Sequence, residues 1–150
     1  MTDVAAQLAE PGRVLVVDDD ASMRASVEAL LALQFQVTSA ANLNDAAVAL
    51  GQAEFDVVLT DYEMPGGSGI DLMRLIRERF PNVLVICVTG YPDQPELRQS
   101  EAQHALLRVI SKPYDPKRLL GWVDNAIRLS RLQRATNRLT QKRGAKKGSG

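Results

Sequence analysis

The sequence is poor in cysteine and histidine and has no long apolar run, and each shortage excludes a class of protein. Its single cysteine, Cys87, allows neither an internal disulfide nor a metal site built from several cysteines. The only histidine, His104, is not expected to pair with Cys87 in catalysis, because Cys87 lies within a run that resembles a buried strand. No apolar run approaches the roughly 18–20 residues of a membrane span, and no apolar signal segment is present. We therefore expect a cytoplasmic protein with no membrane contact.

The composition is that of an ordinary folded protein, with an uneven distribution of charge. The chain has 150 residues, of which 45% are hydrophobic and 24% charged, enough for one domain with a sizeable core. The net charge is zero, but eight of the 18 basic residues and none of the 18 acidic ones lie after residue 127. We expect a leader over residues 1–11, one acidic domain over 12–130 and a basic tail over 131–150 that is a helical extension or a linker.

Short apolar runs alternate with stretches of helical spacing along the body of the chain. The runs expected to form strands are 13–17, 35–40, 56–60, 82–88 and 106–110. Helices are expected after each, with Ser22 and Asn42 as N-caps of the first two and a weak polar helix over 96–103. Five strands alternating with five helices predict an α/β fold, a doubly wound parallel sheet covered on both faces.

Polar residues follow several of these strands at the point where each strand ends. The first run leads into Asp18, Asp19 and Asp20, the third into Asp61, the fourth into Thr89, and the fifth into Lys112. In an open parallel sheet the carboxyl ends of the strands are where ligands bind. Acids after a strand can also be simple caps or loop residues, but the polar ends of four strands favour a common site.

This set of side chains suits magnesium-dependent phosphoryl chemistry. Clustered carboxylates repel one another unless a cation compensates, and Mg²⁺ prefers carboxylate oxygens while keeping room for water and phosphate. A carboxylate beside the metal can itself attack phosphorus and become an aspartyl phosphate. A lysine and a hydroxyl can then hold the other phosphoryl oxygens.

Four segments carry a resemblance to a known family. They are VLVVDDD at 14–20, DVVLTDYEMPGGSG at 56–69, VTG at 88–90 and SKP at 111–113. In this order and spacing they resemble the receiver domains of bacterial two-component response regulators, over about residues 12–130. The resemblance implies a single (βα)5 domain of flavodoxin-like strand order 2-1-3-4-5, here with an extended last helix.

The resemblance also implies a role for each matching residue. Asp61 would be the phosphoacceptor, and Thr89 and Lys112 would hold the phosphoryl group and report its arrival. Asp19 and Asp61 would bind Mg²⁺ directly, Asp18 mainly through water, and the backbone carbonyl of Glu63 would supply a further ligand. The phosphate would come from a sensor histidine kinase or a phosphotransfer protein, or from small phosphodonors. Activity would be limited to self-phosphorylation and autodephosphorylation, without turnover.

Three positions depart from the family's usual pattern. Val109 stands where an aromatic switch residue is common, and the sequence suggests Tyr91, two residues after Thr89, as a substitute. Glu63, two residues after Asp61, puts an acid where a side chain can touch the attacking water. Gly90 replaces a common alanine and leaves the approach to the phosphate open.

The output of such a switch is expected on the face formed by the fourth helix, the fifth strand and the fifth helix. It would act on a partner or on an output domain that the sequence does not identify. Nucleic-acid binding by the basic tail is disfavoured, because the tail has no aromatic stacking residues and no reading motif. A homodimer through the last helix is suggested by residues near a and d heptad positions: Trp122, Leu129, Leu132, Thr136 and Leu139.

Two other functions use the same residues. The segment Asp61-Tyr62-Glu63 is similar to the Asp-x-Asp of haloacid-dehalogenase-type phosphatases, although glutamate replaces the second aspartate. Those hydrolases also place the nucleophile on their first strand, and the chain has no room for a substrate-selecting cap. The other alternative is a structural dimerisation module that is never phosphorylated. The complete set of polar residues at the strand ends argues against it: Asp18, Asp19, Asp61, Thr89 and Lys112.

Overall fold

The computed structural model describes residues 10–64, 69–102 and 107–148 of the chain. Most of the leader expected at 1–11, the loop residues 65–68 and His104 lie outside the described residues. The side chains of residues 101–102 and 141–148 are likewise outside the description, although their backbone is helical.

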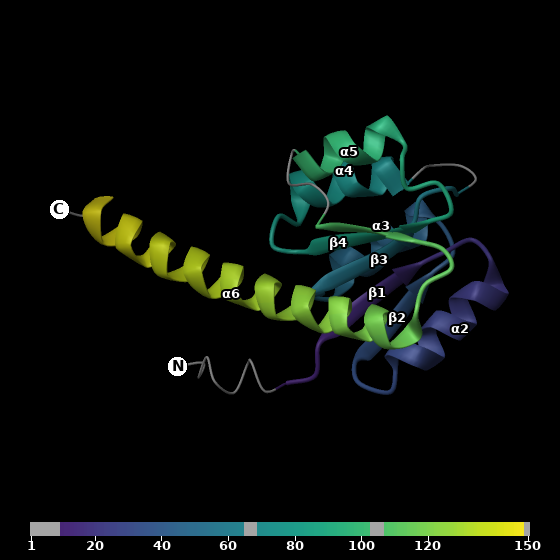
Figure 1. Cartoon of the computed structure of the whole chain (residues 1–150). Coiled ribbons are helices and arrows are strands. Elements are labelled where there is room, and N and C mark those ends of the chain that lie inside the picture. Colours follow the sequence, from purple (N-terminus) through teal and green to yellow (C-terminus); the bar gives the residue numbers. More distant parts are fainter. Residues whose placement is uncertain (1–9, 65–68, 103–106, 149–150) are drawn as a thin grey trace.

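Five parallel strands form one sheet at the centre of the molecule (Figure 1). The strands are β1 (Arg13–Val17), β2 (Gln36–Ala40), β3 (Val57–Asp61), β4 (Leu84–Thr89) and β5 (Arg108–Ser111). Their order is β2-β1-β3-β4-β5, and every neighbouring pair is parallel. This confirms the doubly wound sheet and its 2-1-3-4-5 order. Residues of β1 and β3 are buried almost throughout, because helices cover both faces of the sheet.

The helices are α2 (Ala21–Leu31), α3 (Leu43–Gln52), α4 (Gly69–Arg79), α5 (Pro95–Ala102) and α6 (Pro116–Gly148). Side chains of α3, α4 and α5 pack with Leu15 and Val17 in one buried cluster. Those of α2 and α6 pack with Val14 and Val16 in the other. Alternate residues of β1 thus point to opposite faces, as the twofold repeat of a strand requires. Figure 1 shows the same division of helices between the two faces.

The two predicted helix caps had different outcomes. The Asn42 side chain accepts the backbone N–H of Asp45 at 2.8 Å, so the cap predicted for α3 is confirmed. The prediction of Ser22 as the cap of α2 is wrong, because Asp20 occupies that position. One Asp20 carboxylate oxygen accepts the N–H groups of Ser22 at 2.9 Å and Met23 at 3.2 Å. A carboxylate also interacts favourably with the positive end of the helix dipole.

The last helix is a single helix of 33 residues, which confirms the extended last helix expected of the fold. Its first half packs on the sheet through buried residues such as Leu119, Val123 and Ile127. Its second half continues past the edge of the sheet, as the green-to-yellow ribbon of Figure 1 shows. None of the helices in the described part of the chain is both long and apolar enough to cross a membrane.

Candidate functional site

Three carboxylates meet at the carboxyl edge of the sheet. Asp18 follows β1 directly, Asp19 comes next, and Asp61 is the last residue of β3. One carboxylate oxygen from each of the three lies within 4.8 Å of the others. The paired strands β1 and β3 bring Asp18 and Asp61 together although 43 residues separate them in sequence. The structure therefore places the three predicted metal-ligating side chains at one point.

The electrostatics of Asp18 show why this cluster suits a cation. Asp18 is only 7% exposed, and its burial is the main cause that raises the pKa of its carboxyl. The negative charges of Asp61 and Asp19 raise this pKa further, while the Asp20 N–H and the Lys112 ammonium lower it. A divalent cation among these oxygens would remove the repulsion, and Mg²⁺ accepts such a set of carboxylates. The donor set therefore fits the ion that the sequence predicts.

Lys112 lies within reach of the predicted phosphoacceptor. Its ammonium nitrogen Nζ is 3.5 Å from Oδ2 of Asp61, and both side chains are partly shielded from solvent. Lys112 follows β5, and its backbone N–H donates to the carbonyl of Thr89 at 2.8 Å. This bond holds the lysine beside the end of β4. The positive charge is therefore placed where a phosphoryl group on Asp61 would bring negative oxygens.

Thr89 ends β4 at the same edge and is 1% exposed. Its hydroxyl oxygen accepts the backbone N–H of Tyr91 at 3.0 Å. A hydroxyl that accepts one hydrogen bond can still donate its own hydrogen. An added Cβ at the neighbouring Gly90 would meet nothing within 4 Å, so a side chain at this position would have room.

The backbone around Asp61 is held by close contacts. The Thr60 hydroxyl donates to the carbonyl of Asp61 at 2.9 Å, and the N–H of Gly69 donates to the carbonyl of Tyr62 at 2.9 Å. A Cβ at Gly69 would lie 2.7 Å from the Asp61 carbonyl oxygen, so only glycine fits here. Glu63, whose carbonyl is the predicted fourth metal ligand, is exposed two residues after Asp61.

One hydrogen bond near the site was not foreseen in the sequence. The Tyr62 hydroxyl donates to the Glu96 carboxylate at 2.7 Å, which links the residue after Asp61 to the first turn of α5. This bond to Glu96 is the main cause that raises the pKa of Tyr62 to about 12. Val109, at the usual aromatic switch position, is half-buried and packs on the cluster that includes Leu97. Tyr91 is 60% exposed.

Comparison with known proteins gives a consistent result. Residues 14–124 match the family described as response regulator receiver domain. The chain is 29% identical over 126 residues to the hydrogenase transcriptional regulatory protein HoxA of Cupriavidus necator, a match that covers 84% of this chain and 26% of HoxA. It is 31% identical to the DNA-binding transcriptional regulator NtrC of Proteus hauseri, covering 85% of this chain and 27% of NtrC. The chain thus spans about a quarter of the length of these relatives.

Comparison of the fold with solved structures also finds receiver domains. A response regulator receiver domain protein from Clostridium thermocellum superposes with a TM-score of 0.76 at 26% sequence identity. The superposition covers 81% of this chain and 98% of that structure. The matched region is therefore nearly a whole receiver domain, and it includes every residue of the acidic cluster.

Proposed function

The chain belongs to the response regulator receiver domain family, and from this we propose that it is a phosphorylation switch with Asp61 as phosphoacceptor. The observation that carries the proposal is the convergence of Asp18, Asp19 and Asp61 within 4.8 Å, with the Lys112 ammonium 3.5 Å from Asp61. Phosphorylation and magnesium binding at an acidic pocket are general features of the family. The roles of the individual residues in this chain are our assignment.

In the proposed reaction a carboxylate oxygen of Asp61 attacks the phosphorus of a phosphohistidine on a sensor kinase or phosphotransfer protein. The new P–O bond forms as the P–N bond breaks, and the imidazole nitrogen keeps the electron pair of that bond. Asp18, Asp19, Asp61 and the Glu63 carbonyl would hold Mg²⁺, which when bound offsets the charge of the incoming phosphoryl oxygens. Lys112 pairs with one of these oxygens, and the Thr89 hydroxyl donates to another.

The proposed output face consists of α5, β5 and α6. Two hydrogen bonds connect the site to this face. One joins Tyr62 to Glu96 on α5, and the other joins Lys112, just after β5, to Thr89. On this face the Arg108 guanidinium of β5 lies 5.1 Å from the centre of the Trp122 ring of α6. We propose that a partner or an output domain reads this face, that a second copy of the chain can pair along α6, and that the protein acts in the cytoplasm.

Intact mass measurement tests the phosphoacceptor directly. The protein is incubated with acetyl phosphate and Mg²⁺, beside Asp61→Asn and a wild-type sample with chelator. We expect one phosphoryl adduct on the wild type and none in the other two samples. If each protein molecule instead released phosphate repeatedly from several phosphorylated compounds, the phosphatase alternative would be favoured. If no adduct formed with acetyl phosphate or with a phosphorylated kinase domain, the structural dimerisation module would be the remaining alternative.

A further inference from the structure

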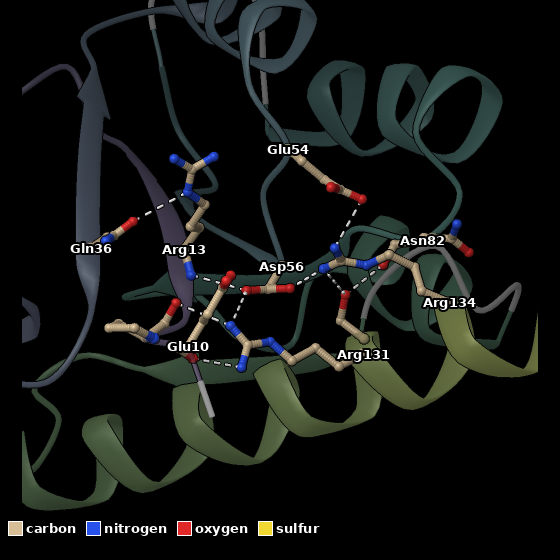
Figure 2. A network of polar contacts seen from close by, with 10 residues as sticks. Glu10, Arg13, Gln36, Glu54, Asp56, Asn82, Arg131 and Arg134 are labelled. Atoms are coloured by element: carbon tan, nitrogen blue, oxygen red, sulfur yellow. Dashed lines mark hydrogen bonds and ion pairs between the residues drawn. The ribbon is translucent and has the colours of Figure 1, made fainter. Parts of the chain in front are cut away.

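A second cluster of charged side chains lies at the end of the sheet opposite to Asp61. Asp56 comes just before β3, whereas Asp61 is its last residue, so the two acids mark opposite ends of one strand. Asp56 is 3% exposed, and one of its carboxylate oxygens accepts the backbone N–H of Arg13 at 2.9 Å. Figure 2 shows that two arginines of α6, Arg131 and Arg134, point at this carboxylate.

Both arginines form ion pairs with Asp56 and also bind neighbouring groups. Arg131 lies 3.4 Å from Oδ2 of Asp56, and it donates to the backbone carbonyls of Glu10 at 2.7 Å and Pro11 at 3.0 Å. Arg134 pairs with Oδ1 of Asp56 and, at 2.9 Å, with Glu54. The cluster thus joins α6 to the segments that precede β1 and β3.

Two uncharged side chains extend this attachment to the segment before β4. The fully buried Ser130 donates its hydroxyl hydrogen to the Asn82 carbonyl at 2.7 Å, and the Asn137 amide donates to the Asn82 side chain at 2.7 Å. From Ser130 to Asn137 the helix therefore bonds to three separate segments at the amino edge of the sheet. These attachments lie beyond residue 124, where the family match ends.

The burial of Asp56 decides how strongly these contacts hold. A carboxylate removed from water is strongly destabilising unless it is paired and hydrogen-bonded, so Asp56 requires its arginines. The Arg131 and Arg134 side chains are only 13% and 18% exposed. By contrast, the Asp124–Arg128 pair on the same helix is 42% and 76% exposed, and exposed pairs of this kind contribute little to stability.

We propose that Asp56, Arg131 and Arg134 form a latch that fixes the direction in which α6 leaves the receiver. The latch makes α6 one rigid arm, from its start close to Lys112 at the carboxyl edge to its exit at the amino edge. A segment that follows α6 is then held in a fixed orientation relative to Asp61. A flexible linker would not fix that orientation. This role goes beyond the phosphotransfer proposed above and does not depend on it.

Hydrogen exchange of the backbone amides in residues 131–140 tests the latch. The full chain is compared with Asp56→Asn and Arg134→Gln, and Asp124→Asn is the matched control that removes an acid from the exposed pair. We expect exchange in this segment to become roughly tenfold faster or more in both latch variants, because Arg134→Gln leaves Asp56 with Arg131 alone and Asp56→Asn removes the carboxylate that both arginines share. The control should exchange like the wild type.

Circular dichroism and a cooperative thermal transition show whether each variant still contains a folded receiver. If Asp56→Asn fails to fold, Arg134→Gln carries the test, since it keeps the carboxylate and its bond to Arg13. Equal exchange in the wild type and in a folded latch variant would overturn the proposal. Unprotected amides over 131–140 in the wild type would overturn it as well.

A distance measurement separates a rigid arm from a helix that merely stays helical. Spin labels at Leu33→Cys and Thr140→Cys, both at exposed positions, report the arm's direction relative to the receiver, and Cys87 is buried and does not compete for the label. Dilution with unlabelled protein removes distances between copies. We expect one narrow distance distribution, which the latch variants broaden and Asp124→Asn does not. A broad wild-type distribution would exclude a fixed direction.

Discussion

Two buried carboxylates at opposite edges of the sheet differ in what neutralises them. Asp56 is paired with arginines of its own chain, and this pairing holds an element in place. The Asp18 carboxylate accepts the N–H of Asp20 and otherwise faces two more acids, with Lys112 nearby, while the Arg24 guanidinium donates to the Asp18 backbone carbonyl at 2.8 Å. Asp18 is therefore a charge that the fold leaves partly uncompensated, which is the arrangement expected where a cation is to bind.

This difference predicts a pH-dependent effect of Asp18→Asn without metal. The pKa of Asp18 is raised in the folded state, so the folded state binds this proton more tightly than the unfolded state. The contribution of Asp18 to the free energy of unfolding is therefore present at low pH and is lost as pH rises through the raised pKa. Without Mg²⁺, Asp18→Asn should therefore raise the thermal midpoint at pH 7 and leave it almost unchanged at about pH 3.

Thermal unfolding with and without Mg²⁺ completes this test. Added Mg²⁺ should raise the midpoint of the wild type at pH 7 and have a smaller effect on Asp18→Asn, since a ligand that binds the folded state stabilises it. A variant that is less stable than the wild type at pH 7 without metal would contradict the electrostatic account of this site.

At the scale of elements, α6 presents different residues to the domain and to the solvent. Ser130, Arg131 and Arg134 face the domain, as their bonds show. Leu132 and Leu139 are 56% and 63% exposed, and the period of 3.6 residues places them on the opposite side of the helix. The charged residues of the latch therefore turn toward the receiver, and apolar residues on the opposite side of α6 remain exposed.

We expect Leu132→Glu to abolish the proposed homodimer. A charge among these exposed apolar residues would be buried against its own copy, which is strongly unfavourable. Light scattering after gel filtration would show a dimer for the wild type and a monomer for the variant. Val48→Glu is the matched control, because Val48 on α3 is also 56% exposed but lies on the other face of the sheet. A wild type that remains monomeric at high concentration would refute the pairing.

At the scale of the whole molecule, α6 connects the two edges of the sheet. It begins a few residues after Lys112, packs over one face, and is bonded to the amino edge through Ser130, Arg131 and Arg134. The predicted division into a domain over 12–130 and an extension over 131–150 places the boundary between Ser130 and Arg131, in the middle of this attachment. A chain cut at that boundary would lose the bonds that Arg131 and Arg134 form with the domain.

We expect a chain that ends at Ser130 to be markedly less stable than one that ends at Thr140. The shorter chain keeps Asp56 but lacks both of its arginines, and breaking a buried pair costs up to roughly 3–5 kcal/mol, less where the remaining carboxylate gains contact with water. Urea unfolding of the two chains measures the difference. Adding Asp56→Asn to the shorter chain should restore part of the loss, whereas equal stability of the two truncated chains would show that the latch contributes little.

The strands and the site residues could be predicted because their signals are local. Apolar runs such as Val14–Val17 mark buried strands, and parallel strands bring the residues after their ends to one edge. The positions of Asp18, Asp61 and Lys112 follow from that rule alone. The cap of α2 was mispredicted on equally local evidence, since Asp20 and Ser22 are both good capping residues and only the start of the helix at Ala21 distinguishes them.

The tertiary structure alone decided the contacts between distant segments. Asp56 reads as the first residue of a strand, and nothing near it in sequence points to Arg131 and Arg134, 75 and 78 residues away. Likewise, Glu96 is 34 residues from Tyr62. The sequence determined the alternation of strands and helices and the polar residues at the strand ends, because each of these signals lies within a few neighbouring residues. Which charges meet at the opposite edge depends on how α6 packs, and no local pattern records that.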